Sequence, residues 1–508
     1  MRKVVVIGAG SAGCVVAARL TEDPDTSVVL LEAGPDYPDV HAAPDDIRSA
    51  FVFAGTDHDW GYVSDGVTAR ADAVNLGSTS AAIPVLRGKV VGGSSAVNGT
   101  SAMRSTPSDF DRWVDAGNDA WSWPQVLPYF RDLENDPAPG EWHGNRGLFP
   151  VRRFAVDHMR PIQRAFLDAC ESRGIAIVED HNAPGAIGAG TVPLNQIDGV
   201  RQSAAVTHLH AARHRENLTL RSGVLVDRLE IVDGTVRAVV LADGERIVAD
   251  EFVLSSGAYG SPAILLRSGI GAVADLVALG IAPVAELPAV GKNLRDHPMF
   301  AVAVAARPDA IGDLEPPVQT MLTIASNGPS TQANIDIEIA MFTVVPDQVF
   351  FGIGMVRPKS VGEMRLSSSD PSDAPRIRLN FFDDPSDVES MVRGVRVVRE
   401  LIASPALAPF VGDEIFPGPA MQDDATLAAA IRATPTSYAH ATGTCRMGAH
   451  ADTSVVDQTG RVHGFANLWV IDASIMPALP SVPTNATTMM LAERCASWLR
   501  NSLSAISS

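Results

Sequence analysis

The sequence has few cysteines, a deficit of basic residues and no long apolar run. Only 4 of its 508 residues are cysteine, and no two form a C-x-x-C pair, which argues against a zinc site or a disulfide framework. Lys and Arg total 40 against 59 Asp and Glu, so the formal net charge is −19, whereas nucleic acids and anionic membranes favour basic surfaces. No window approaches the ~18 uninterrupted apolar residues of a membrane helix, and the N-terminus shows no signal-peptide pattern. We expect a cytoplasmic protein with no metal, no nucleic-acid partner and no membrane span.

The N-terminus has the pattern of a dinucleotide-binding unit. Residues 3–7 (KVVVI) are a β-branched run typical of a buried parallel strand, and the glycine turn 8–13 (GAGSAG) follows directly. Residues 14–23 suit a helix, and a second apolar run, 27–32, ends at an acid. This order of strand, G-x-G-x-x-G turn, helix, strand and acid is the order that dinucleotide binding requires.

Each glycine of this turn, and the acid after the second apolar run, has a separate physical task. Gly8 makes the tight turn, Gly10 lets the backbone approach a pyrophosphate, and Gly13 lets the helix pack on the strand. The pyrophosphate would lie on the N-terminus of the helix, beside Ser11. Glu32 can accept hydrogen bonds from the adenosine ribose, which favours a ribose without a 2′-phosphate. The motif indicates FAD or NAD and does not decide between them.

The remaining pattern predicts two packed domains with discontinuous boundaries. Residues 221–257 indicate a β-meander, and residues 335–345 and 388–403 indicate a strand and a helix in a mixed region. Residues 466–499 return to a strand and then a helix, so the C-terminus would close the nucleotide domain. We assign residues 1–150, 191–300 and 435–508 to that domain, and residues 151–190 and 301–434 to the second.

Four further glycine-rich segments carry a family resemblance. They are residues 87–99 (RGKVVGGSSAVNG), 257–271 (GAYGSPAILLRSGIG), 290–297 (VGKNLRDH) and 440–448 (HATGTCRMG). In this order they closely resemble the glucose–methanol–choline (GMC) family of FAD-dependent oxidoreductases, and weaker matches such as 109–134 extend the likeness over nearly the whole chain. The resemblance implies an α/β, Rossmann-like FAD-binding domain plus an α+β substrate-binding domain whose antiparallel sheet covers the flavin.

The resemblance also implies which residues contact FAD. They are Gly8, Gly10, Ser11, Gly13, Glu32, Gly92, Gly93, Asn98, Val224, Asp472, Ala473, Asn485 and Thr487. Family members that attach FAD covalently use a histidine immediately before the asparagine of the 87–99 segment. Val97 occupies that position here, so we expect FAD to be bound non-covalently. The N-terminus of the last helix should stabilise the negative charge of the reduced flavin.

The catalytic positions that the resemblance implies are His440 and Pro483. A histidine at the place of His440 takes the proton of the alcohol in this family, a task that suits a side chain whose unperturbed pKa is near ~6.5. The family usually has a second polar residue about 43 positions later, where this chain has Pro483. Within the family that the chain resembles, such a His–Pro pair implies an aromatic or heteroaromatic primary alcohol such as pyridoxine. If the alignment is displaced by two residues, Asn485 is the partner and the substrate indication disappears.

We therefore expect an FAD-dependent enzyme that oxidises a small primary alcohol to an aldehyde. Oxygen or another electron acceptor would reoxidise the flavin, and the sequence does not separate an oxidase from a dehydrogenase. One alternative is a hydroxynitrile-type lyase, because this scaffold is also used for cleavage with FAD merely bound. Another is an electron-transfer protein without an alcohol site, against which His440 argues. We expect His297, at the end of the 290–297 segment, to be structural.

Overall fold

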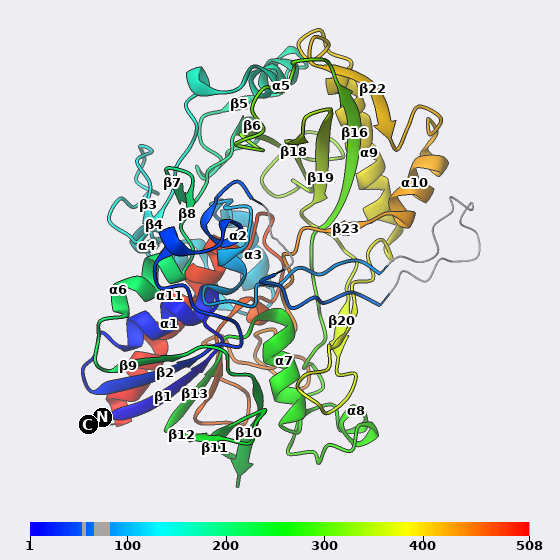
Figure 1. Cartoon of the computed structure of the whole chain (residues 1–508). Coiled ribbons are helices and arrows are strands. Elements are labelled where there is room, and N and C mark those ends of the chain that lie inside the picture. The colour runs from blue at the N-terminus through cyan, green and yellow to red at the C-terminus, as the bar shows by residue number, and fades with distance from the viewer. Residues whose placement is uncertain (53–56, 66–81, 507–508) are drawn as a thin grey trace.

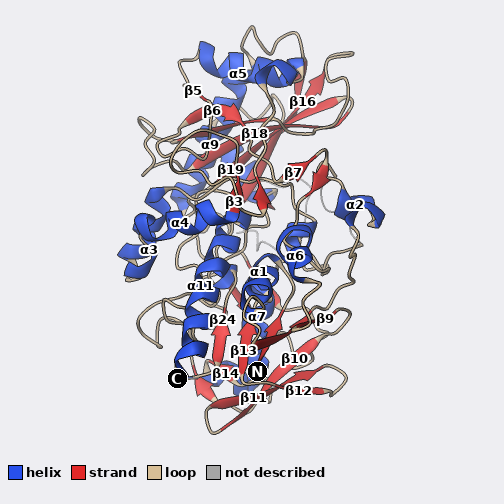
Figure 2. Cartoon of the chain, turned by 90° about the vertical axis from the view of Figure 1, so that its left-hand side faces the viewer, coloured by secondary structure: helices blue, strands red, loops and turns tan. Residues whose placement is uncertain are grey.

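The computed structural model describes residues 1–52, 57–65 and 82–506, and it contains two large sheets at opposite ends of the molecule (Figure 1). The first is parallel and is built from the two ends and the middle of the chain. The second is mainly antiparallel and is built from strands between residues 177 and 437. Both chain ends lie together below the parallel sheet (Figures 1 and 2).

The parallel sheet has five strands in the order β24–β13–β1–β2–β9. Their bounds are Leu468–Val470 for β24, Glu251–Leu254 for β13, Arg2–Ile7 for β1, Thr26–Leu31 for β2 and Leu218–Arg221 for β9. The β-branched run predicted as a strand is β1, and its valines are fully buried because neighbouring strands flank β1 on both sides and helices cover the sheet.

Two helices from opposite ends of the chain pack beside each other on this sheet (Figure 2). They are α1 (Ser11–Leu20), which follows the glycine turn, and α11 (Asn485–Ile506), which ends the described chain. Arg19 on α1 forms a bidentate ion pair with the Glu493 carboxylate on α11, with N–O distances of 2.6 and 2.9 Å. The predicted closure of the nucleotide-binding unit by the C-terminus is therefore present.

The predicted β-meander is also present. It comprises β10 (Val226–Val232), β11 (Thr235–Leu241) and β12 (Arg246–Val248), which pair antiparallel in that order. Asp233 and Gly234 join the first two strands with φ angles of 49° and 70°, the left-handed conformation that a tight hairpin turn requires.

The second sheet has the order β22–β16–β19–β18–β17–β6–β5, and its central pairings are antiparallel. The strands are Val411–Phe416 (β22), Pro298–Ala306 (β16), Gln348–Met355 (β19), Ile337–Val345 (β18), Thr320–Ile324 (β17), Gly188–Thr191 (β6) and Ile177–Val178 (β5), and β23 (Thr436–Ser437) pairs with β16. Helices α5 (Pro161–Ser172) and α9 (Pro385–Ile402) pack on it. The strand and helix predicted in this region are β18 and α9.

Shorter elements connect these layers. The helices are α2 (Asp45–Arg48), α3 (Pro107–Asp115), α4 (Trp123–Leu133), α6 (His210–Ala212), α7 (Gly257–Arg267), α8 (Val273–Ala278) and α10 (Asp424–Ala433). The strands are β3 (Glu134–Asn135), β4 (Phe149–Pro150), β7 (Gln196–Ile197), β8 (Val200–Arg201), β14 (Ile270–Gly271), β15 (Ala285–Glu286), β20 (Glu363–Arg365) and β21 (Arg376–Arg378). None of the helices in the described ranges is long and apolar enough to cross a membrane.

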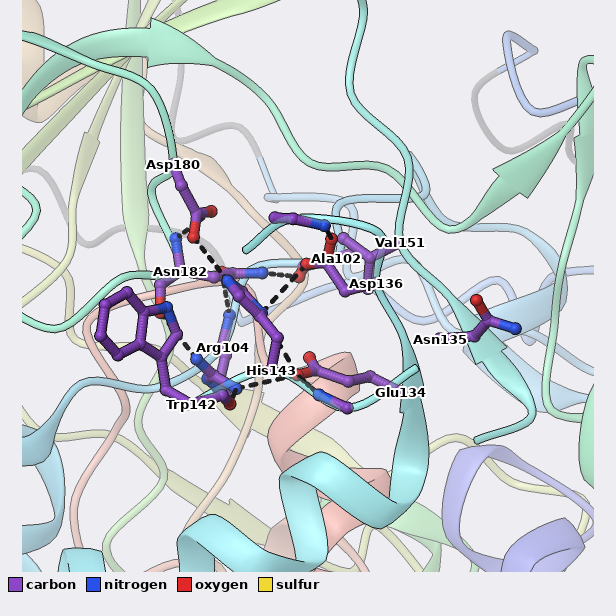
Figure 3. Close-up of polar contacts among 12 residues, drawn as sticks. Ala102, Arg104, Glu134, Asn135, Asp136, Trp142, His143, Val151, Asp180 and Asn182 are labelled. Atoms are coloured by element: carbon purple, nitrogen blue, oxygen red, sulfur yellow. Dashed lines mark hydrogen bonds and ion pairs between the residues drawn. The ribbon is translucent and has the colours of Figure 1, made fainter. Parts of the chain in front are cut away.

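A buried ionic cluster joins the loops between these layers (Figure 3). It consists of three acids and three bases: Glu134, Asp136, Asp180, Arg104, Arg153 and His143. Arg104 pairs with Glu134 at 3.0 Å, and the Nε2 atom of His143 lies 2.8 Å from the Asp180 carboxylate. Burial alone would lower the pKa of His143, but the hydrogen bonds to Asp180 and Glu134 raise it to about 9.

The acids and His143 come as close together as metal ligands do. The ligand atoms of Glu134, Asp136 and His143 all lie within 4.8 Å of one another. Arg104 and Arg153 already bind these carboxylates, however, and a protonated His143 brings the charge of the six groups to zero. The cluster is therefore balanced by its own side chains, and its ion pairs join four segments of the chain.

Candidate active site

One cavity of about 660 Å³ extends from the glycine turn after β1 to the antiparallel sheet. Its walls come from the turn at residues 7–12, the segment 86–101, the residues around 437–441 and the start of α11. Strands β16 to β19 close its other end with alternate side chains. The cavity therefore touches both sheets and all but one of the glycine-rich segments that carried the family resemblance.

The dinucleotide end of the cavity is shaped by glycines whose side chains would not fit. Gly8 has a φ of 100°, and a Cβ at Gly13 would collide with the Gly8 carbonyl, so α1 can approach β1 closely only with glycine there. A Cβ at Gly93 would lie 2.6 Å from the Gly10 Cα atom. Two bare backbone turns thus meet here and leave a cradle against which a large ligand can lie.

Glu32 closes this end. It is 7% exposed, its Oε2 accepts a hydrogen bond from the Ala9 N–H at 3.0 Å, and its Oε1 accepts one from the Gly34 N–H at 2.9 Å. Burial raises its pKa to about 7, and the two backbone N–H groups oppose that rise. The carboxylate oxygens retain lone pairs for a further donor, as a ribose hydroxyl would provide.

Most of the residues predicted from the sequence meet around this one cavity. Those that line it are Gly8, Gly10, Ser11, Glu32, Gly93, Asn98, Val224, Asp472, Ala473, Asn485, His440 and Pro483. Gly13, Gly92 and Thr487 lie behind the wall: Gly13 between α1 and β1, Gly92 next to Ala205, and Thr487 in a 2.6 Å hydrogen bond with Ser105.

The polar groups of the wall fit an elongated cofactor with phosphates and a polar ring. Asp472 accepts hydrogen bonds from the Ser261 hydroxyl and the Gly257 N–H, and so fixes the loop before α7. The Asn485 Oδ1 atom accepts a hydrogen bond from Ser11 at 2.9 Å. Its Nδ2 atom is buried and has no hydrogen-bond partner among the described residues, so a donor points at a place that a ligand can fill.

The end of the cavity nearer the antiparallel sheet is built around His440. The segment follows β23, and Ala439 has a φ of 63°, a left-handed conformation that is unusual for a residue with a side chain. The His440 N–H donates to the Asp296 carboxylate at 2.8 Å, and the Ala439 carbonyl accepts a hydrogen bond from Arg87. As a result the rings of Tyr438 and His440 stack, with centroids 5.3 Å apart and planes at 9°.

His297, expected to be structural, lies directly against His440. Its Nε2 atom is 2.9 Å from the Pro480 carbonyl oxygen, and its Nδ1 atom is 2.9 Å from Nδ1 of His440. A carbonyl can only accept, so a neutral His297 donates from Nε2 and accepts at Nδ1. His440 must then donate from its own Nδ1, which leaves Nε2 as the atom with the free lone pair. The sequence offered no sign of this contact, because 143 residues separate the two histidines.

Both histidines are held neutral. Burial, with a smaller effect from Arg112, lowers the pKa of His297 to about 3. Burial also holds the pKa of His440 well below its ordinary value, and His297 and Arg87 act in the same direction. A neutral imidazole with one free lone pair at the wall of a cavity is able to accept a proton from a bound hydroxyl group.

Such a cavity, joined to a glycine-lined cradle, is consistent with a dinucleotide-dependent oxidoreductase. The family model for GMC oxidoreductases matches the chain over residues 2–299 with its N-terminal part and over residues 358–492 with its C-terminal part. The chain therefore belongs to the GMC oxidoreductases, and it is an FAD-dependent enzyme of the kind that acts on CH–OH donors.

Three relatives illustrate the range of the family. The chain is 34% identical to human mitochondrial choline dehydrogenase over 97% of its own length and 88% of the relative. It is 34% identical to 5-(hydroxymethyl)furfural oxidase of Methylovorus sp. over 97% of both chains. The crystal structure of pyridoxine 4-oxidase from Mesorbium loti superposes with a TM-score of 0.90 and 32% identity, over 99% of both chains.

Proposed function

We propose that this enzyme oxidises an aromatic or heteroaromatic primary alcohol to the aldehyde, with His440 as the proton acceptor. The observation that carries the proposal is the chain Pro480 carbonyl–His297–His440, which leaves one nitrogen of a neutral imidazole free beside the cavity. Bound FAD supplies the two-electron oxidant for the carbon-bound hydrogen of the alcohol. His440 accepts the hydroxyl proton, and His297 fixes the tautomer that makes this possible.

The substrate end of the cavity supports an aromatic alcohol. Met299, Met321, Phe342 and Phe350 contribute apolar side chains from the antiparallel sheet to its wall. Pro483 lines the same cavity as His440 and provides no N–H donor to a substrate oxygen. The likeness to pyridoxine 4-oxidase agrees with such a substrate.

The alternative position for the second catalytic residue, Asn485, has less support. Its side chain is tied to Ser11 of the glycine turn, at the dinucleotide end of the cavity. We therefore keep Pro483 as the residue that faces the substrate and assign Asn485 to FAD. Val97 lines the cavity where an attaching histidine would stand, and a valine cannot form a bond to the flavin, so we propose that FAD is held non-covalently.

The residues that would hold FAD divide by position. The glycine turn and Glu32 would bind the pyrophosphate and the adenosine ribose, and Gly93 with Asn98 would lie along the flavin. The N-terminus of α11 would favour negative charge at the flavin, because the helix dipole is positive there. The two-domain division at residues 151–190 and 301–434 stays a prediction, as do Val224, Ala473 and Thr487 as FAD contacts.

We further propose that the enzyme works in the cytoplasm and takes no nucleic-acid partner. All four cysteines are buried and free, as a reducing compartment would leave them, and the net charge of −19 disfavours nucleic acid. Oxygen or another acceptor completes the cycle, and a direct comparison of turnover in air and with a quinone identifies it.

The test of the function is aldehyde formation from a panel of benzyl alcohol, pyridoxine and ethanol. We expect aldehyde from the aromatic alcohols, and a decrease of about 10²–10⁴-fold in His440→Ala, the usual contribution of a positioned proton acceptor. His450→Ala is the matched control, because that histidine is exposed and outside the cavity wall. Equal rates in His440→Ala and His450→Ala would contradict the assignment of the base.

A further inference from the structure

A single carboxylate interrupts the face of the antiparallel sheet that closes the cavity. Alternate residues of β16 to β19 form this face, among them Met299, Met321, Ala340, Phe342 and Phe350. Glu338 on β18 occupies the same face, and among the described strand residues that line the cavity it is the only charged one. An acid at this place interrupts the apolar pattern that the sheet otherwise needs for packing.

Glu338 is buried with few groups nearby that could stabilise a negative charge on its carboxylate. It is 7% exposed, and its side-chain partner among the described residues is the Tyr438 hydroxyl, which donates across a long 3.5 Å. Within the described chain, no Lys, Arg or His nitrogen lies within 4.0 Å of its carboxylate. Burial raises the pKa of Glu338 to about 7 against the opposing hydrogen bond from Tyr438. A charged group in such a position is costly unless a ligand compensates it.

The position of Glu338 connects it to the catalytic histidine. Gly354 of β19 stands opposite Glu338 in the sheet register, and a Cβ at Gly354 would collide with the ring of Tyr438. The edge of the Tyr438 ring therefore lies against the sheet at Gly354, with the hydroxyl beside Glu338, and a face of the same ring stacks on His440. The carboxylate is thus one tyrosine ring away from the proton acceptor, a separation that a small alcohol can bridge.

We propose that Glu338 determines specificity by binding a positively charged nitrogen on the alcohol substrate. The substrate class is a primary alcohol that carries a pyridinium ring or a quaternary or protonated amine. Its charge would neutralise the buried carboxylate, and the aromatic faces of Tyr438, Phe342 and Phe350 would add cation–π attraction. This inference rests on the proposed function, since it places the cation at the substrate end of the same cavity.

The experiment compares alcohols that match in shape and differ in charge. The pairs are choline with 3,3-dimethylbutan-1-ol, and N-methylpyridinium-3-methanol with benzyl alcohol, with kcat/KM measured on the FAD-loaded enzyme. We expect a charged-to-neutral ratio above ten in at least the aromatic pair for the wild type. In Glu338→Gln the ratio should fall by about 10- to 100-fold, the range expected for a charge-assisted contact, and mainly through KM.

The control variant is Asp347→Asn, which removes one negative charge at the exposed turn after β18, outside the cavity wall, and should keep the wild-type ratio. Calorimetry of N-methylpyridinium against toluene gives a second readout that needs no turnover, and Glu338→Gln should bind only the cation more weakly. If no alcohol is oxidised, the proposed function fails, and calorimetry alone decides the role of Glu338.

A ratio at or below one in the wild type, or an unchanged ratio in Glu338→Gln, overturns the proposal. If Glu338→Gln does not fold, Glu338→Asp replaces it, because that variant keeps the charge and moves it back by one methylene. Its ratio should lie between one and the wild-type value, and a ratio equal to that of the wild type would count against the proposal.

Discussion

Replacing His297 tests the most specific feature of the site, the fixed tautomer of His440. In His297→Leu the Nδ1–H of His440 loses its acceptor inside a buried site, and nothing then holds the lone pair at Nε2. A buried donor without a partner costs about 1–3 kcal/mol, so alcohol oxidation should slow by about 5- to 150-fold. We expect the change in kcat, with KM and FAD content near their wild-type values, because His297 does not line the cavity.

His297→Asn separates this positioning role from a merely structural one. The asparagine Oδ1 atom can stand near the place of Nδ1 and accept from His440, so it should restore part of the rate that the leucine variant loses. The assay is anaerobic stopped-flow bleaching of the flavin by benzyl alcohol for the wild type and both variants. Equal losses in the two variants, or wild-type rates in His297→Leu, would refute the tautomer argument.

Three further predictions concern the cofactor and the ionic cluster. Acid precipitation should release all the yellow FAD into the supernatant, because Val97 cannot form a covalent bond to the flavin. A coloured pellet would disprove this. Glu32→Ala should lower FAD retention and the melting temperature together, through lost ligand linkage, and an unchanged flavin content would remove Glu32 from the site. The pKa of His143 is raised from ~6.5 in the unfolded chain to about 9 in the folded protein. The contribution of protonated His143 to the free energy of unfolding is therefore complete below about pH 6.5, and it is lost as the pH rises through about 9. Relative to His143→Gln, the wild type should lose roughly 3 kcal/mol of unfolding free energy over that window, as measured by urea denaturation, and parallel pH curves would contradict the linkage.

The sequence predicted those helices, strands and turns whose pattern of apolar residues and glycines lies within a single short segment. The β-branched run at residues 3–7, the glycine turn after it and the final helix all form as expected, because hydrophobic periodicity and glycine placement act over a few residues. Most of the residues predicted to bind FAD line one cavity for the same reason, since each belongs to a motif with a fixed local geometry.

What the sequence could not predict depends on contacts between distant segments. His297 meets His440 only because β23 pairs with the start of β16, and that pairing is a property of the tertiary fold. Glu338 gave no signal either, because an acid in an alternating strand is normally placed on the solvent face. The ionic cluster around His143 likewise draws its members from four segments of the chain.

The central claim is that this chain oxidises an alcohol at the flavin, and anaerobic mixing with an aromatic primary alcohol tests it most directly. We predict that the flavin absorbance near 450 nm bleaches on mixing, that one aldehyde forms for each flavin reduced, and that His440→Ala slows both together. A flavin that stays oxidised while substrate is consumed would contradict the account and would indicate a lyase.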